Sequence, residues 1–130
     1  MFLAIRTDKP EAELRLLRNE STIDTYSWQA HRELADTLLI KIRELLQKNQ
    51  ADLEDLQGII IFSGEGSFTG LRIGTSVANT MAYSLAIKIA EGSGQDWLRN
   101  GLQNLKQAKL GEFVIPRYNA EPNITKPKIK

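Results

Sequence analysis

Apolar and polar positions in the first thirty residues follow the two-residue period of strands. The apolar run from Phe2 to Ile5 predicts a first strand, which ends before the turn residues around Pro10. From Glu11 to Arg18 apolar residues alternate with mostly charged ones, which predicts a second strand. A helix is the competing interpretation there, because Glu, Leu and Arg favour helices. The segment from Thr22 to Trp28 is rich in β-branched and aromatic residues and predicts a third strand.

Helical and buried-strand patterns follow. The segment from His31 to Asn49 carries an apolar stripe at helical spacing and predicts a long helix. The run from Gly58 to Phe62 is apolar without alternation, which indicates a strand buried on both faces beside a parallel neighbour. A second long helix is predicted from about Gly70 to Leu85, a further strand over 86–90 and a short amphipathic helix over 97–106. The stripe of the first long helix includes Leu38, Ile42 and Leu45.

The second long helix carries no charge beyond its first turn. A surface helix of a monomer normally shows a charged face, so this helix is covered either within the fold or by another protein chain. Full coverage within so small a domain is difficult to arrange, which favours a partner. The face in question combines small side chains at four-residue spacing with an apolar neighbour: Gly74, Ala78, Met81 and Ala82.

Composition excludes several classes of site. The 130 residues suffice for one domain, and the formal net charge of +1 implies no general attraction to nucleic acid or membrane. The absence of cysteine excludes disulfides, thiolate zinc sites and cysteine nucleophiles, and fits a reducing cytosol. No apolar run is long enough for a membrane span, and no signal peptide is expected at the N-terminus.

A glycine-rich loop separates the buried strand from the second long helix. A strand, a turn of glycine and hydroxyl residues and a helix start can together present backbone N–H groups to an anion. It is not a Walker A loop, because no Gly-Lys-Ser/Thr follows. A structural turn that lets the helix lie close on the sheet is the favoured interpretation. The candidate anion-binding residues are Gly64, Gly66, Ser67, Thr69 and Gly70.

His31 is the one histidine of the chain. Neither a second histidine nor an acidic cluster at metal-ligand spacing accompanies it. It is therefore interpreted as a capping or packing residue rather than as a metal ligand or an acid–base group.

The loop sequence identifies a family. Gly64-x-Gly66-Ser67-Phe68-Thr69-Gly70-Leu71-Arg72-Ile73-Gly74 resembles the GPGSFTGLRIG signature of the bacterial TsaB (YeaZ) family, with Glu65 in place of the usual proline. Leu3-Ala4-Ile5-x-Thr7 resembles the family's opening LAIDT. The order of elements is that of a ribonuclease-H-like domain, the unit of actin-like and Hsp70-like ATPases. We therefore expect an α/β fold: one such lobe, with a mixed sheet of about five strands and two long helices.

The resemblance implies a role in tRNA modification. TsaB proteins are non-catalytic partners of TsaD, the enzyme that makes N6-threonylcarbamoyladenosine (t6A) in tRNA, and the ATPase TsaE joins the assembly. The resemblance implies pairing with TsaD through the two long helices, with tRNA contacted only indirectly, no cofactor and a cytoplasmic location. A homodimer through the same helices is a further expectation for the isolated chain. The expected interface residues are Leu38, Ile42, Leu45, Gly74, Ala78, Met81 and Ala82.

The chain departs from the family in two respects. Family members usually have two lobes, whereas here residues 1–110 are expected to form a single lobe and 111–130 an extended, partly disordered tail. The segment 113–118 resembles the family's C-terminal end, which implies loss of most of the second lobe. Arg6 stands where the family and the related ATPases have a metal-positioning aspartate, and arginine cannot ligate Mg²⁺. ATP hydrolysis is therefore not expected, and the alternative function is a small anion- or nucleotide-binding domain that uses the glycine loop.

Overall fold

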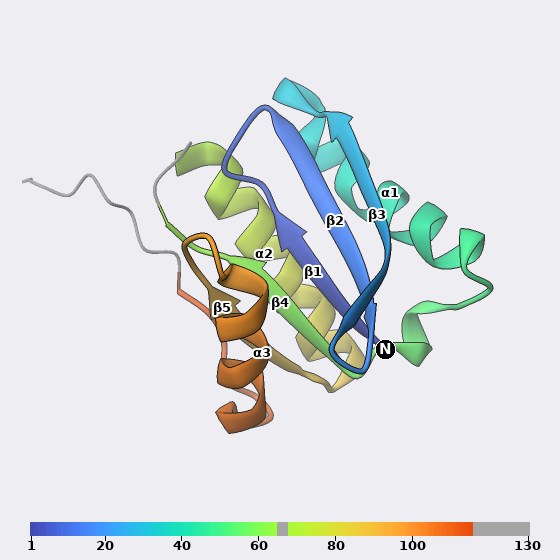
Figure 1. Cartoon of the computed structure of the whole chain (residues 1–130). Helices are drawn as coiled ribbons and strands as arrows, with labels where there is room; N and C mark the ends of the chain where they lie inside the picture. Colours follow the sequence, from blue (N-terminus) through green and yellow to red (C-terminus); the bar gives the residue numbers. More distant parts are fainter. Residues whose placement is uncertain (65–67, 116–130) are drawn as a thin grey trace, which may run out of the picture.

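One mixed sheet organises the chain. A computed structural model describes residues 1–64 and 68–115. The sheet has five strands in the order β3-β2-β1-β4-β5 (Figure 1). The first three strands form an antiparallel meander, and β4 and β5 continue it in parallel with β1. This arrangement confirms the predicted fold class. The strands are β1 (Phe2–Arg6), β2 (Glu11–Arg18), β3 (Ser21–Gln29), β4 (Gly58–Phe62) and β5 (Lys88–Gly92).

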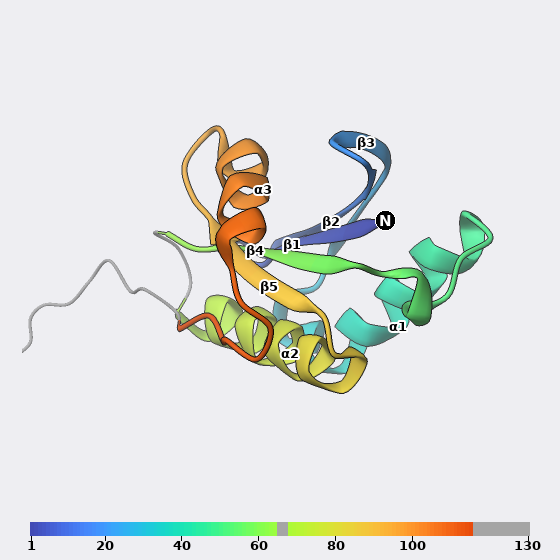
Figure 2. The ribbon, with the colours of Figure 1, turned by 90° about the horizontal axis from the view of Figure 1, so that it is seen from below.

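The helices cover the sheet unequally. The helices α1 (Leu34–Lys48) and α2 (Phe68–Leu85) lie on one face, and α3 (Trp97–Gln107) lies on the other over β4 and β5 (Figure 2). Short 3₁₀ turns, η1 (His31–Glu33) and η2 (Leu53–Asp55), precede α1 and β4. Among the described residues, no helix is both long and apolar enough to cross a membrane.

The fifth strand begins two residues later than the sequence indicates, because a capped helix end occupies its predicted start. Ala86 adopts a φ of 55°, and its N–H donates to the carbonyl oxygen of Tyr83 over 3.2 Å. The N–H of Ile87 donates to the carbonyl oxygen of Ala82 over 3.0 Å. This pair of bonds is the Schellman motif that ends α2 and turns the chain toward β5.

Alternate residues of the central strands pack into two separate hydrophobic cores. Leu3 and Ile5 of β1 pack toward α1 and α2 in the larger core, whereas Ala4 packs toward α3 in the smaller one. In β4, Ile59 and Ile61 likewise belong to the larger core and Ile60 and Phe62 to the smaller. A strand buried on both faces needs an unbroken apolar run, which explains the composition of β4.

The helix α2 lies unusually close to the end of β1. A Cβ atom at Gly74 would lie 2.1 Å from Thr7 Oγ1, and the same hydroxyl donates a hydrogen bond to the carbonyl oxygen of Gly70 over 2.8 Å. A side chain at Gly74 therefore has no room unless α2 moves outward. Gly74 of the signature thus allows the close packing of α2 against the end of β1.

The chain after α3 returns to the opposite face of the sheet. It passes the edge strand β5 and reaches α2 (Figure 2), where the side-chain amide of Asn79 holds the backbone of Val114. Residues 111–115 form no regular element, and Val114 is only 8% exposed. Of residues 111–115, only Val114 is buried against the domain, and 116–130 lie outside the described residues.

We predict that Gly74→Ala lowers the free energy of unfolding by about 2 kcal/mol, because the added methyl overlaps Thr7. Helix propensity alone would raise the free energy of unfolding by up to about 1 kcal/mol, so a decrease would indicate the overlap with Thr7. Urea denaturation measures it, with Thr80→Ala on the exposed side of α2 as a control expected within about 0.5 kcal/mol of the wild type. A Gly74→Ala variant as stable as the wild type would contradict the close approach.

Candidate functional site

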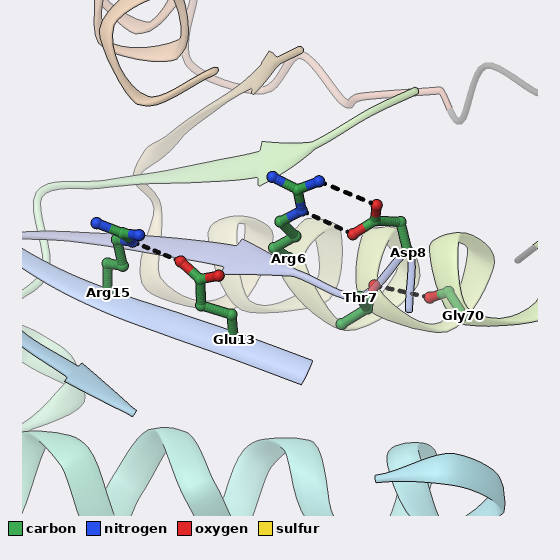
Figure 3. A network of polar contacts seen from close by, with 6 residues as sticks. All are labelled: Arg6, Thr7, Asp8, Glu13, Arg15 and Gly70. Carbon is green, nitrogen blue, oxygen red and sulfur yellow. Dashed lines mark hydrogen bonds and ion pairs between the residues drawn. The ribbon is translucent and has the colours of Figure 1, made fainter. Parts of the chain in front are cut away.

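An ion pair lies at the carboxyl end of β1. Arg6 Nε donates to Asp8 Oδ1 over 2.8 Å and Nη2 donates to Oδ2 over 3.2 Å (Figure 3). The guanidinium carbon of Arg6 lies 3.9 Å from the centroid of the Phe62 ring and 5.9 Å from that of Trp97. Both oxygens of the buried Asp8 carboxylate are thus engaged by a cation that aromatic rings hold in place.

The resemblance described above implies a metal-positioning acid at the position that Arg6 occupies in this chain. Asp8 lies two residues beyond that position, and its carboxylate faces the guanidinium of Arg6. Within residues 1–64 and 68–115, no group of three or more His, Cys, Asp or Glu side chains is placed to hold a metal ion.

The structure describes only part of the candidate anion loop. Gly64 follows β4, and Thr69 and Gly70 belong to the first turn of α2. Gly66 and Ser67 lie outside the described residues. A hollow of about 360 Å³ lies beside the first turn of α2, and the basic residues that line it are Lys9, His31 and Arg32. Anion binding by the loop stays a prediction.

The structure corrects the residues predicted for a partner surface. All seven are buried within the chain itself, and none of the six with a side chain beyond glycine is more than 7% exposed. Their small or apolar side chains face the sheet and the neighbouring helix, because α2 can approach β1 closely only along its small face. They are Leu38, Ile42, Leu45, Gly74, Ala78, Met81 and Ala82.

The outward face of α2 is exposed to solvent and carries no charge beyond Arg72. Tyr83 is 73% exposed, and Ser76, Thr80 and Ser84 accompany it on the solvent side of the helix. The exposed large apolar residues of α1 are Leu39 and Ile40. The sequence already separates two faces of α2, since Ser76, Thr80, Tyr83 and Ser84 lie opposite Ala78 and Ala82 on a helical projection. What the projection alone does not show is which of the two faces turns toward the sheet.

Comparison with known proteins identifies the family. The family model described as TsaD, tRNA N6-adenosine threonylcarbamoyltransferase, matches residues 27–93, from the end of β3 to β5. The chain is 32% identical over 97 residues to the tRNA threonylcarbamoyladenosine biosynthesis protein TsaB of Bacillus subtilis, which is 75% of this chain and 42% of that protein. The chain belongs to the TsaB/YeaZ family. The TsaB of Escherichia coli is 28% identical over 134 residues, which cover 94% of this chain and 56% of that protein.

The solved structures support the same fold. YeaZ from Pseudomonas aeruginosa matches with a TM-score of 0.65 and 27% identity, over 71% of this chain and 43% of that one. The neighbour and the family model together show the ribonuclease-H-like fold that the sequence predicts. The chain spans about half the length of the curated relatives it matches.

We predict that Arg6→Met lowers the free energy of unfolding by about 2 kcal/mol, because the buried Asp8 carboxylate loses its donors. The double variant Arg6→Met/Asp8→Leu is expected to recover at least half of that loss, since no charge is then left unpaired. Urea denaturation of both single variants and the double variant measures the coupling. If the loss of unfolding free energy in the double variant equals the sum of the losses in the single variants, the two side chains do not depend on one another.

Proposed function

We propose that this chain takes part in t6A formation on tRNA as a non-catalytic partner of TsaD, which it contacts through the outward faces of α1 and α2. The observation that carries the proposal is the uncharged, exposed face of α2 in a member of the TsaB/YeaZ family. TsaE joins the assembly in this proposal, and tRNA is contacted through TsaD rather than by this chain.

The outward face of α2 suits a helix–helix contact. Beyond Arg72 its exposed residues are uncharged, and Ser76, Thr80 and Ser84 recur every four residues. Their side chains are small, so that a second helix can approach closely, while Tyr83 offers a large ring that is 73% exposed. A helix face that stays in water normally carries charge, and this one does not.

The similarity to TsaD itself supports the pairing. The TsaD family model covers 27–93, which includes α1, β4 and α2. A TsaD of Geotalea uraniireducens, named as a tRNA N6-adenosine threonylcarbamoyltransferase, is 38% identical over 61 residues. A TsaD chain therefore carries counterparts of these elements, and two chains that present matching helices can pair about an approximate two-fold axis. The same geometry would allow a homodimer of the isolated chain.

The ion pair at the end of β1 supports a role without nucleotide chemistry. A metal-bound nucleotide needs oxygen ligands for Mg²⁺, and here the nearby Asp8 carboxylate is held by Arg6. The alternative function, an anion- or nucleotide-binding domain, uses the loop from Gly64 to Gly70, and the hollow lined by Lys9 and Arg32 lies beside the end of that loop. Calorimetry with MgATP, ADP and phosphate separates the two: tight, magnesium-dependent binding by the isolated chain would favour the alternative.

The direct test is reconstitution with TsaD, TsaC, TsaE and tRNA from the same organism. We expect this chain to form a complex with TsaD at micromolar concentration and to restore t6A formation in a mixture that lacks TsaB. Absence of a complex at that concentration would contradict the proposal.

We predict that Tyr83→Asp weakens binding to TsaD at least about tenfold, because a charge on the outward face must lose its hydration in the interface. Gln103→Asp is the matched control, since Gln103 is exposed on α3 at the opposite face of the sheet. Calorimetry gives both affinities, and circular dichroism verifies the fold. A charge at the buried Ala78 would disrupt the core and so does not test pairing. Equal losses in the two variants would place the interface elsewhere.

A further inference from the structure

A hollow of about 400 Å³ opens on α2 where the chain returns after α3. Ser76, Asn79, Thr80 and Tyr83 of α2 form one side, and Phe113 forms the other. None of the described residues that line it is charged. The ring centroids of Tyr83 and Phe113 lie 6.4 Å apart in a tilted arrangement, and the two side chains are 73% and 57% exposed. Two neighbouring aromatic rings this exposed form an apolar surface beside an open hollow.

A specific contact fixes the wall that Phe113 supplies. Asn79 Nδ2 donates to the carbonyl oxygen of Val114 over 2.8 Å, and the N–H of Val114 donates to Asn79 Oδ1 over 3.0 Å. The amide of Asn79 thus binds both backbone polar groups of one residue, and the Val114 side chain is buried. Since Phe113 directly precedes Val114, these two hydrogen bonds hold the backbone of Phe113 beside α2.

The chemistry of the lining selects an apolar occupant. A lysine or glutamate that entered the hollow would lose hydration without meeting a counter-ion among these residues. An aliphatic or aromatic side chain would instead contact the two rings and the methyl group of Thr80. The hollow is already formed in the free chain, so its occupation requires little ordering.

We propose that this hollow receives an apolar side chain from a helix of the TsaD partner, which makes Phe113 part of the docking surface. The inference rests on the proposed function. It follows from continuity, because Ser76, Thr80 and Tyr83 belong both to the hollow and to the outward face of α2 that we assign to TsaD. Phe113 then has a role in recognition, while Val114 beside it packs against the domain.

The test is the affinity of the full chain for TsaD, measured by calorimetry. Phe113→Ala is expected to weaken binding about fivefold or more, as is usual when an anchor pocket loses a wall. Phe113→Leu retains an apolar wall and should remain within about threefold of the wild type on the same reasoning. Ile115→Ala is the matched control, because Ile115 belongs to the same segment, is 78% exposed and does not line the hollow; we expect a change below about twofold.

The outcomes separate this inference from the proposed function. If the wild type binds TsaD and Phe113→Ala binds equally well, the hollow is not an anchor site, and the helix pairing stands without it. If Ile115→Ala weakens binding as much as Phe113→Ala, the segment acts as a whole and the hollow is again overturned. If the wild type does not bind TsaD at all, the proposed function itself fails. Urea midpoints of all variants should match, because Phe113 and Ile115 are exposed.

Discussion

The contact between Thr7 and the first turns of α2 determines the rest of this structure. One hydroxyl at the end of β1 bonds to the carbonyl oxygen of Gly70 and fills the space beside Gly74. With the helix axis held this close, the next small residues along that face, Ala78 and Ala82, also lie against the core. The rotation of α2 about its own axis is thereby fixed, and with it the identity of every residue that the helix shows to solvent.

That rotation explains how a helix almost free of charge can lie at the surface of a small domain. Its small face is covered by the sheet and α1, and its outward face consists of hydroxyl side chains and Tyr83. Hydroxyl groups keep the face hydrated in the free chain, yet lose less on burial than charged groups do. Such a face is compatible with both a free and a bound state, which a partner subunit needs.

The sequence predicted the fold better than the site, for a physical reason. The strands and helices follow from local periodicity, and the unbroken apolar run of β4 requires a doubly covered strand. The Arg6–Asp8 pair is also local, because it joins residues only two apart in the chain. In contrast, Ala78 and Ala82 produce the same pattern whether they face a sheet or another protein. The contact between Asn79 and Val114 joins residues 35 apart, and no periodicity in the sequence predicts such a contact.

The carboxyl end of β1 and the C-terminal half of α2 differ in how much unpaired surface they offer to a binding partner. At the carboxyl end of β1 the Arg6 guanidinium bonds to Asp8 and lies over the Phe62 ring, so the charges of Arg6 and Asp8 satisfy each other. At the far end of α2 the hydroxyl face, Tyr83 and Phe113 present surface that the described chain leaves exposed. Free energy of association comes from surface that is still exposed before binding, and not from groups that are already paired. The outward face of α2 therefore offers more exposed surface to a protein partner than the Arg6–Asp8 pair offers to a nucleotide, and this is the physical reason why we propose recognition, rather than chemistry, for this chain.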